Sequence, residues 1–571
     1  MTHDLVIRGG DLIDGSGAPR RRADVAIDGG QITAVGKVAS KGRDEIDADG
    51  LIVAPGFVDI HTHYDGQVTW DPYLSPSSSH GVTTVVMGNC GIGFAPMHPA
   101  SREWAYQLVD GVEDIPQASL AEGIRWDWES YPEYLDAVAR SPLAIDVGSM
   151  VPHGAVRVYV MGDRGSDHVE AATEDEIAAM GALVAEGLAA GALGVSTSRT
   201  KNQRGRDGRI TPTFSACRDE LLGISQPLKD AGRGVLQIVA DGIDSEEEFA
   251  LFEEVAAATG RPLSLAVVTV NEDPALHRRV LQRISEANAD RLPITAQVAV
   301  RPIGFLLGFD GTLHPFVNRP SYAAIAHLGH AERVARLRDP ATRQRILAEG
   351  SVDRGLMGYV ATAWEHMFVL GDPPDYEPPP ERSVAAIAAQ QGVDPDEVAY
   401  DLLLQRDGTE ILYVPALNYA GGDLDETRAM LLAPEAVVGL SDAGAHCGYI
   451  CDASSPTFLL THWARDRSRG ERLPLEFVVR AQTRRPAELI GLTDRGLIAP
   501  GMKADINVID FDELRLLAPQ VVHDLPAGGR RLVQSATGYR QTIVSGTVVF
   551  DDAEPTGQLP GRLVRGGRLT G

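Results

Sequence analysis

Two histidines separated by one residue are the first chemically suggestive feature of this chain. His61 and His63 follow the apolar segment LIVAPGFVDI over 51–60. Alternate residues of a β-strand point to the same face, so the two imidazoles would project together, with their backbones about 6–7 Å apart. Neutral imidazole is a common ligand of zinc and similar ions. The pair therefore indicates a metal site, although two ordinary polar residues at the end of a strand would look the same.

Two further residues of ligand type follow apolar segments elsewhere in the chain. Cys90 stands in MGNCG and Asp442 in LSDAGAH. Imidazole, thiolate and carboxylate are all donors that zinc accepts in proteins. Each residue also has an ordinary structural explanation, because a lone cysteine is often a small buried apolar residue and an aspartate often caps a helix.

A second set of polar residues could hold a substrate. His153 stands in VPHG, and Ser196 and Ser198 lie in ALGVSTS. We expect His153 to support the site or to bind substrate rather than to bind metal. Its imidazole or the serine hydroxyls could donate hydrogen bonds to an oxyanion or to a substrate carboxylate.

All these residues follow short apolar segments that alternate with helical stretches. Eight such segments, with amphipathic helices over 173–191 and 245–260, predict an α/β fold. The first choice is a (β/α)8 barrel of the TIM type, and a doubly wound sheet is the second. In such a barrel the C-terminal strand ends form the active site, which would bring these residues together. The predicted strands cover 51–60, 81–88, 144–152, 192–198, 234–240, 262–270, 293–300 and 436–442.

The two ends of the chain have a different pattern from the middle. Residues 1–53 and 499–571 carry short apolar segments without a helical period, and in the first of them Gly-Gly and Asp-Gly turns separate these segments. We predict that the two ends form one small β-sandwich beside a catalytic barrel over 54–498. Residues of about 301–400 are too many for one barrel connection, and they include the proline-rich GDPPDYEPPPE. They are predicted to be a lid-like insertion.

Composition narrows the class of protein. A net charge of −27 over 571 residues disfavours binding to nucleic acid or to anionic membranes. Four cysteines are too few for a disulfide scaffold, and Cys217, Cys447 and Cys451 are not expected to bind metal. No segment approaches 18 apolar residues, and the first residues lack a signal-peptide pattern. We therefore expect a cytoplasmic protein with reduced thiols and the size of an enzyme.

Six sequence blocks, in their order along the chain, resemble the amidohydrolase superfamily. They are PGFVDIHTHYD, GVTTVVMGNCG, VPHGAVR, AGALGVSTS, LSDAGAH and RPAELIGLTDRGLIAPGMKADINVID. The MGNCG block resembles the D-aminoacylase branch, whose members deacylate N-acyl-D-amino acids. The resemblance spans nearly the whole chain and implies a metal-dependent barrel with a small β-sandwich built from both termini.

The resemblance implies roles for four residues. His61 and His63 match the metal ligands of the first strand, and Cys90 matches the cysteine ligand of the branch. Asp442 matches the aspartate of the eighth strand, which acts as general acid and base beside the metal. The implied cofactor is one divalent ion, and zinc is expected.

The chain departs from the branch on the fifth and sixth strands, where the branch has one histidine each. The matching positions fall near Val239 and Val267, and Gln237 and Asp241 are the nearby polar residues. The resemblance with these two histidines missing implies a mononuclear centre, or a centre whose chemistry differs from that of the branch.

The resemblance also implies an amide substrate. Water activated by the metal would attack the carbonyl, and Asp442 would pass a proton to the leaving nitrogen. The carboxylate of an N-acyl amino acid requires a cation, for which Arg199 is the first choice, ahead of Arg157 and Arg301. Hydrolysis of another amide or a cyclic imide, and a non-catalytic binding homologue, are the alternatives. Association into a homo-oligomer is compatible with each.

Overall fold

Eight strands, one of them interrupted and therefore divided into the two strands β8 and β9, run parallel in the middle of the described chain and give the molecule a mixed α/β fold. The computed structural model describes residues 2–350 and 356–566. The first sheet has the order β6–β7–β8, and the second has the order β17–β13–β12–β11–β10–β9. Only Met150 separates β8 from β9, and a parallel bridge between Thr62 and Ala443 links the loops after β6 and β17. The strands are β6 (Phe57–Asp59), β7 (Val82–Met87), β8 (Asp146–Ser149), β9 (Val151–Pro152), β10 (Gly194–Arg199), β11 (Val235–Ala240), β12 (Leu263–Ala266), β13 (Ile294–Val298) and β17 (Ala436–Val438).

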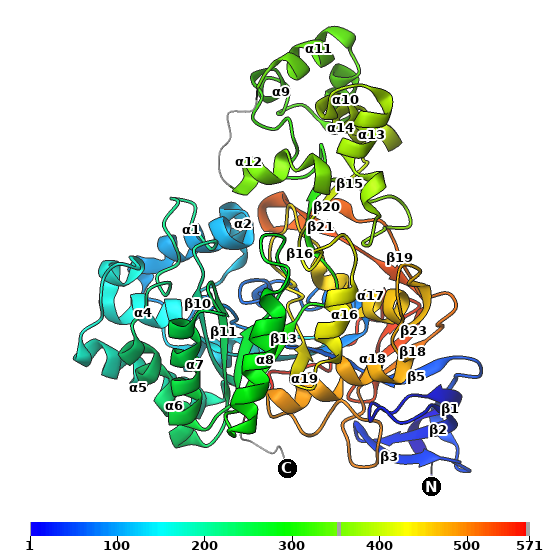
Figure 1. The fold of residues 1–571 in the computed structure, drawn as a ribbon. Helices are drawn as coiled ribbons and strands as arrows, with labels where there is room; N and C mark the ends of the chain where they lie inside the picture. The colour runs from blue at the N-terminus through cyan, green and yellow to red at the C-terminus, as the bar shows by residue number, and fades with distance from the viewer. Residues whose placement is uncertain (1, 351–355, 567–571) are drawn as a thin grey trace.

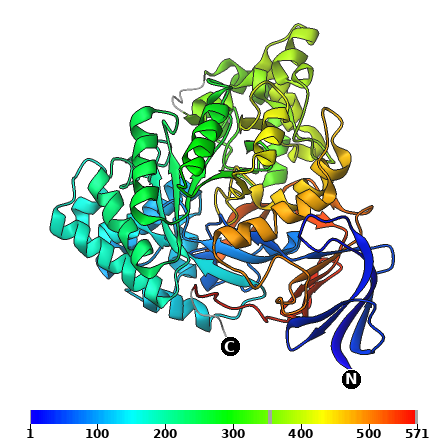
Figure 2. The same ribbon diagram turned by 60° about the horizontal axis from the view of Figure 1, so that its bottom comes forward.

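Amphipathic helices connect these strands and cover their outer side (Figures 1 and 2). Helix α5 (Glu174–Ala190) begins with a complete capping box, in which Thr173 and Glu176 each bond the other's backbone N–H. Helix α7 (Glu246–Thr259) begins at Ser245, whose hydroxyl accepts the N–H of Glu248. Among the described residues, no helix is long and apolar enough to cross a membrane.

The apolar segment 51–60 is two strands rather than the single strand that its composition predicts. Its first half is β5 (Ile52–Pro55), which pairs with the terminal strands, and its second half is β6. The chain changes sheets at Gly56, where a Cβ atom would lie 2.2 Å from the Thr83 hydroxyl. Uniform apolar character hides the break, because both halves are fully buried.

Strands from both ends of the chain form one sheet. Its order is β25–β24–β23–β18–β5–β1–β2–β3, and β4 pairs with the free part of β1. The blue N-terminal and orange-red C-terminal strands lie together beside the parallel strands (Figure 2). The bounds are β1 (His3–Leu12), β2 (Arg21–Asp28), β3 (Gln31–Gly36), β4 (Gly42–Asp47), β18 (Ile506–Ile509), β23 (Tyr539–Val544), β24 (Thr547–Asp551) and β25 (Glu554–Pro555).

The long connection between β13 and β17 forms a lobe at the top of Figure 1. Strands β14 (Ile303–Leu307), β16 (Leu412–Leu417) and β15 (Phe368–Val369) make an antiparallel sheet in it. Its own apolar core includes Tyr449 and Ile450, which follow Asp442 in the chain, so the lobe packs on the loop after β17. Its helices are α9 (Pro320–Ala323), α10 (His330–Leu337), α11 (Pro340–Ala348), α12 (Leu356–Ala361), α13 (Val384–Gln391) and α14 (Pro395–Leu403).

Candidate metal centre

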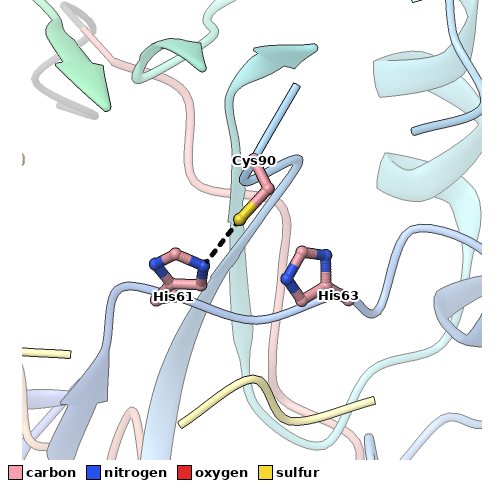
Figure 3. A group of neighbouring side chains, drawn as sticks. All are labelled: His61, His63 and Cys90. Carbon is pink, nitrogen blue, oxygen red and sulfur yellow. Dashed lines mark hydrogen bonds between the residues drawn. The ribbon is translucent and has the colours of Figure 1, made fainter. Parts of the chain in front are cut away.

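His61, His63 and Cys90 converge just beyond the ends of two adjacent strands (Figure 3). The histidines follow β6 and the cysteine follows β7. One ligand atom from each lies within 4.8 Å of the others, and all three residues are buried. Nε2 of His61 lies 3.1 Å from Sγ of Cys90. The two imidazole rings lie side by side, with centroids 5.5 Å apart, although both stand on the loop after β6 rather than on the strand itself.

A tight turn presents the Cys90 thiol. Cys90 has a φ of 56° and stands between Gly88 and Gly91, whose φ values are also positive. The Ser196 hydroxyl binds both glycines, since it donates to the carbonyl of Gly88 and accepts the N–H of Gly91. Oε1 of Gln237 accepts the Cys90 N–H at 2.9 Å. Neighbouring strands therefore hold a left-handed conformation that a cysteine rarely adopts.

Asp442 completes the group from the loop after β17. Its Oδ1 lies 3.1 Å from Nε2 of His61 and 3.5 Å from Nε2 of His63. Asp442 has a φ of 45°, and the hydroxyl of neighbouring Ser441 donates to Asp59. Its side chain is 18% exposed, so this edge of the group faces solvent.

The far nitrogen of each imidazole faces a further side chain. Nδ1 of His61 lies 2.5 Å from Oε1 of Gln297 on β13. Nδ1 of His63 lies 3.4 Å from Oε1 of Glu113, at the end of α1 (Arg102–Glu113). Sequence reasoning missed both residues. Glu113 could have been noticed as an acidic residue on the apolar face of an amphipathic helix.

The four groups shift one another's proton affinities. Burial lowers the pKa of His61, but the neighbouring Cys90 and Asp442 charges raise it to about 9. Burial raises the pKa of Cys90, but the imidazole of His61 brings it below its ordinary value. The same imidazoles hold the pKa of Asp442 below its usual range despite burial. Opposed shifts of this kind, produced by close charge partners, are typical of functional sites.

The donor set fits a zinc ion. Bonds of about 2.0–2.3 Å to tetrahedral ligands place neighbouring donor atoms about 3.3–3.8 Å apart. The distances of 3.1 and 3.5 Å from Asp442 to the imidazoles are close to this range. Two imidazoles and one thiol are donors that zinc accepts, and a catalytic zinc keeps its fourth position open, here on the side of Asp442.

His153 lies in a different polar cluster. It begins α4 (His153–Met161), and its ring bonds Thr197 at 2.9 Å and Glu220 at 3.0 Å. Glu220 also accepts from Arg157, whose remaining N–H groups bond backbone carbonyls. Both predicted substrate-binding candidates are therefore engaged in a buried ion-pair network.

The other predicted substrate contacts differ in whether their polar groups already have partners within the protein. Arg199 forms an ion pair with Glu248 and donates to the carbonyl of Ala216, so its guanidinium is already engaged. Ser196 supports the Cys90 turn, as described above. The buried hydroxyl of Ser198 makes no hydrogen bond with any described residue.

The fifth and sixth strands supply no ionisable ligand to the group. Val239 is half-buried and Val267 is buried in the apolar core. Asp241 instead accepts from Thr200 and Lys201 in a loop. Gln237 is the polar residue of β11 that reaches Cys90, and its Nε2 has no hydrogen-bond partner within the described ranges.

Comparison with known proteins identifies the family. A family model described as "Amidohydrolase family" matches residues 44–550. The chain belongs to this family. Two similar amidohydrolases come from Alcaligenes xylosoxydans xylosoxydans. A D-aminoacylase is 30% identical, with 98% of this chain and 97% of the relative covered. An N-acyl-D-aspartate deacylase is also 30% identical, with 99% and 95% covered.

Solved structures of amidohydrolases share the whole architecture. A D-aminoacylase studied for its binuclear metal centre has a TM-score of 0.66 and 25% identity. An N-acyl-D-glutamate deacylase from Bordetella bronchiseptica, solved with zinc and a phosphonate inhibitor, has a TM-score of 0.65 and 25% identity. Each comparison covers 99% of this chain and 100% of the other. The likeness therefore extends over both the parallel strands and the terminal sheet.

Proposed function

We propose that this amidohydrolase removes the acyl group from an N-acyl amino acid, using one zinc ion held by His61, His63 and Cys90, with Asp442 beside the position that stays open for water. The observation that carries the proposal is the convergence of these four side chains at the ends of parallel strands. The relatives that act on N-acyl-D-aspartate and N-acyl-D-glutamate support the substrate class.

We also propose that the eight parallel strands close into a (β/α)8 barrel and that the terminal sheet is part of a β-sandwich. The single residue between β8 and β9 and the bridge between Thr62 and Ala443 support closure, because they connect the two parallel sheets at both sides. On this view the barrel covers about 54–498, the lid-like insertion 301–400, and the sandwich 1–53 with 499–571.

Zinc in this position would supply Lewis acidity toward the amide carbonyl and would lower the pKa of water. The protein's own acid and base is Asp442. Its carboxylate, charged at neutral pH, takes the proton of the attacking water and then transfers it to the leaving nitrogen. Asp442 lies beside the two imidazoles and has an exposed edge, so its carboxylate can reach both the attacking water and the leaving nitrogen.

We propose Arg301 as the contact for the substrate carboxylate. It follows β13 and is buried, and only its Nη2 is bonded, to Asp452 and to the carbonyl of Cys451. Nε and Nη1 have no hydrogen-bond partner in the described chain, and Tyr376 lies over the guanidinium at 4.0 Å. The substrate carboxylate could accept hydrogen bonds from these N–H groups once a neighbouring side chain moves aside. Ser198 remains the candidate hydroxyl for a polar substrate atom.

A cytoplasmic location and a small-molecule substrate are part of the proposal. The described cysteines are all free, and Cys217 is exposed, which suits a reducing compartment. Assembly into a homo-oligomer remains compatible with this function.

Metal analysis and a substrate panel test the proposed function together. We expect about one zinc ion per chain, with loss of zinc in His61→Ala and in His63→Ala. His153→Gln is the matched control, because this histidine lies in a separate cluster, and it should keep zinc. A panel of N-acyl-D- and N-acyl-L-amino acids, with their carboxamides, then identifies the substrate. A folded protein that binds no zinc under any supplementation would exclude the hydrolase.

A further inference from the structure

Glu113 occupies a place that is unfavourable for a carboxylate in three ways. It is the last residue of α1, where the helix carries partial negative charge. It lies on the buried face of that helix, four residues after Val109. Its side chain is 2% exposed, and neither oxygen accepts a hydrogen bond from a residue that the structure describes. Buried charged groups are normally compensated by a partner, so this one requires an explanation.

The nearest polar groups are two imidazoles. Oε1 lies 3.4 Å from Nδ1 of His63, and Oε2 lies 3.8 Å from Nε2 of His446. The other nitrogen of His63 faces Asp442 at 3.5 Å. Glu113 therefore contacts the rear of a candidate ligand, on the side of the ring away from the donor group.

We propose that Glu113 is a positioning residue for the metal centre: from its present 3.4 Å it accepts the Nδ1–H of His63 once a cation is bound, and so keeps Nε2 turned toward Asp442 and Cys90. The inference rests on the proposed function, because it requires His63 to bind a cation. A carboxylate behind a ligand imidazole fixes its tautomer and raises its basicity, and losing such a partner typically weakens metal binding about 10–100-fold.

The neighbouring ligand shows why charge matters here. Behind His61 stands the carboxamide of Gln297, whose oxygen can only accept and so fixes the same tautomer. Gln297 adds no charge, whereas Glu113 adds one negative charge beside the centre. The two histidines thus have one neutral and one anionic partner, and the anionic one compensates the charge of a bound cation.

Glu113→Ala and Glu113→Gln test the inference. Glu410→Gln is the matched control, because Glu410 is a buried glutamate whose Oε1 accepts the backbone N–H of Ile411. Zinc affinity is measured by competition with a chelator, and the Co²⁺ absorption spectrum reports the ligand geometry. We expect about 10–100-fold weaker zinc binding in Glu113→Ala. Glu113→Gln keeps an acceptor oxygen, so the loss of zinc affinity in this variant should be smaller, about threefold or more. Glu410→Gln should match the wild type.

The outcomes separate this inference from the proposed function. Tight wild-type binding of zinc that is unchanged in both Glu113 variants overturns the positioning role alone. Wild-type protein that binds neither zinc nor Co²⁺ overturns the proposed function and this role with it. Circular dichroism checks folding, and if Glu113→Ala does not fold, the Glu113→Gln affinity decides.

Discussion

The C-terminal ends of the parallel strands differ between two sides of the molecule. On one side, the loops after β6 and β7 bring His61, His63 and Cys90 within 4.8 Å of one another, and the loop after β17 brings Asp442 within 3.5 Å of both imidazoles. On the other side, β11 and β12 offer the neutral carboxamide of Gln237, the hydroxyl of Ser264 and otherwise apolar residues. Gln237 supports Cys90 through its backbone rather than adding a donor.

This difference indicates a centre for one cation. The ligand side has the three donors and the open position of a catalytic zinc ion, and the other side supplies no second set of ionisable ligands. A D-aminoacylase with a similar fold has been studied as a binuclear enzyme in which one metal activates and the second attenuates. The present chain has kept the elements of that fold while its fifth and sixth strands lack ionisable ligands.

The largest expected effect on the ligand side is that of Asp442→Asn. The amide keeps an oxygen near the imidazoles but cannot take a proton from water, so kcat should fall by about 10³-fold or more. Zinc content, measured on the same preparation, should remain near that of the wild type. Turnover above a tenth of the wild-type value would refute the acid–base role.

The second prediction concerns the pH dependence of zinc binding. Without metal, the pKa of His61 is about 9, and a ligand imidazole must be neutral. Each pH unit below 9 should therefore weaken apparent zinc affinity at least about tenfold, because the pKa of the other ligand imidazole, His63, is also raised and a second proton must leave. Calorimetry in buffers of different ionisation enthalpy measures the proton released. Affinity that stays constant between pH 7 and 9 would contradict the coupling.

The third prediction concerns the side of the strand ends that lacks ligands. Gln237→Met removes the acceptor of the Cys90 N–H, so the left-handed turn should loosen and zinc affinity should fall about tenfold. Ser264→Ala on β12 is the control, because its buried hydroxyl makes no hydrogen bond within the described part of the chain. Equal zinc affinity in the two variants would show that Gln237 does not support the thiol.

Much of this arrangement could be predicted from the sequence, because parallel strands bring their C-terminal ends to one edge. The convergence of His61, His63 and Cys90, and the approach of Asp442 to the two imidazoles, follow from that rule once the apolar segments are found. The break at Gly56 could not be predicted, since both halves of 51–60 are equally apolar and the change of sheet depends on distant strands.

The outer partners of the ligands were also beyond sequence reasoning. Gln297 lies 236 residues from His61, and the two meet only because β13 and β6 both approach β17. The substrate-binding role predicted for Arg199 depended on its position after a strand. Its actual partner, Glu248, lies in the first turn of the helix after the next strand, and only the folded chain brings them together.

The smallest expected effect distinguishes two arginines at strand ends. Arg199 is engaged by Glu248, so Arg199→Met should change KM less than about threefold while lowering stability by about 1–3 kcal/mol. Arg301→Met should instead raise KM about tenfold or more for an N-acyl amino acid, and much less for its carboxamide. Steady-state kinetics on both substrates, with thermal unfolding, measures the contrast. Only an arginine that contacts the substrate can distinguish its carboxylate from the corresponding carboxamide. A larger loss of this selectivity in Arg199→Met than in Arg301→Met would therefore place the substrate carboxylate at the end of β10 rather than β13.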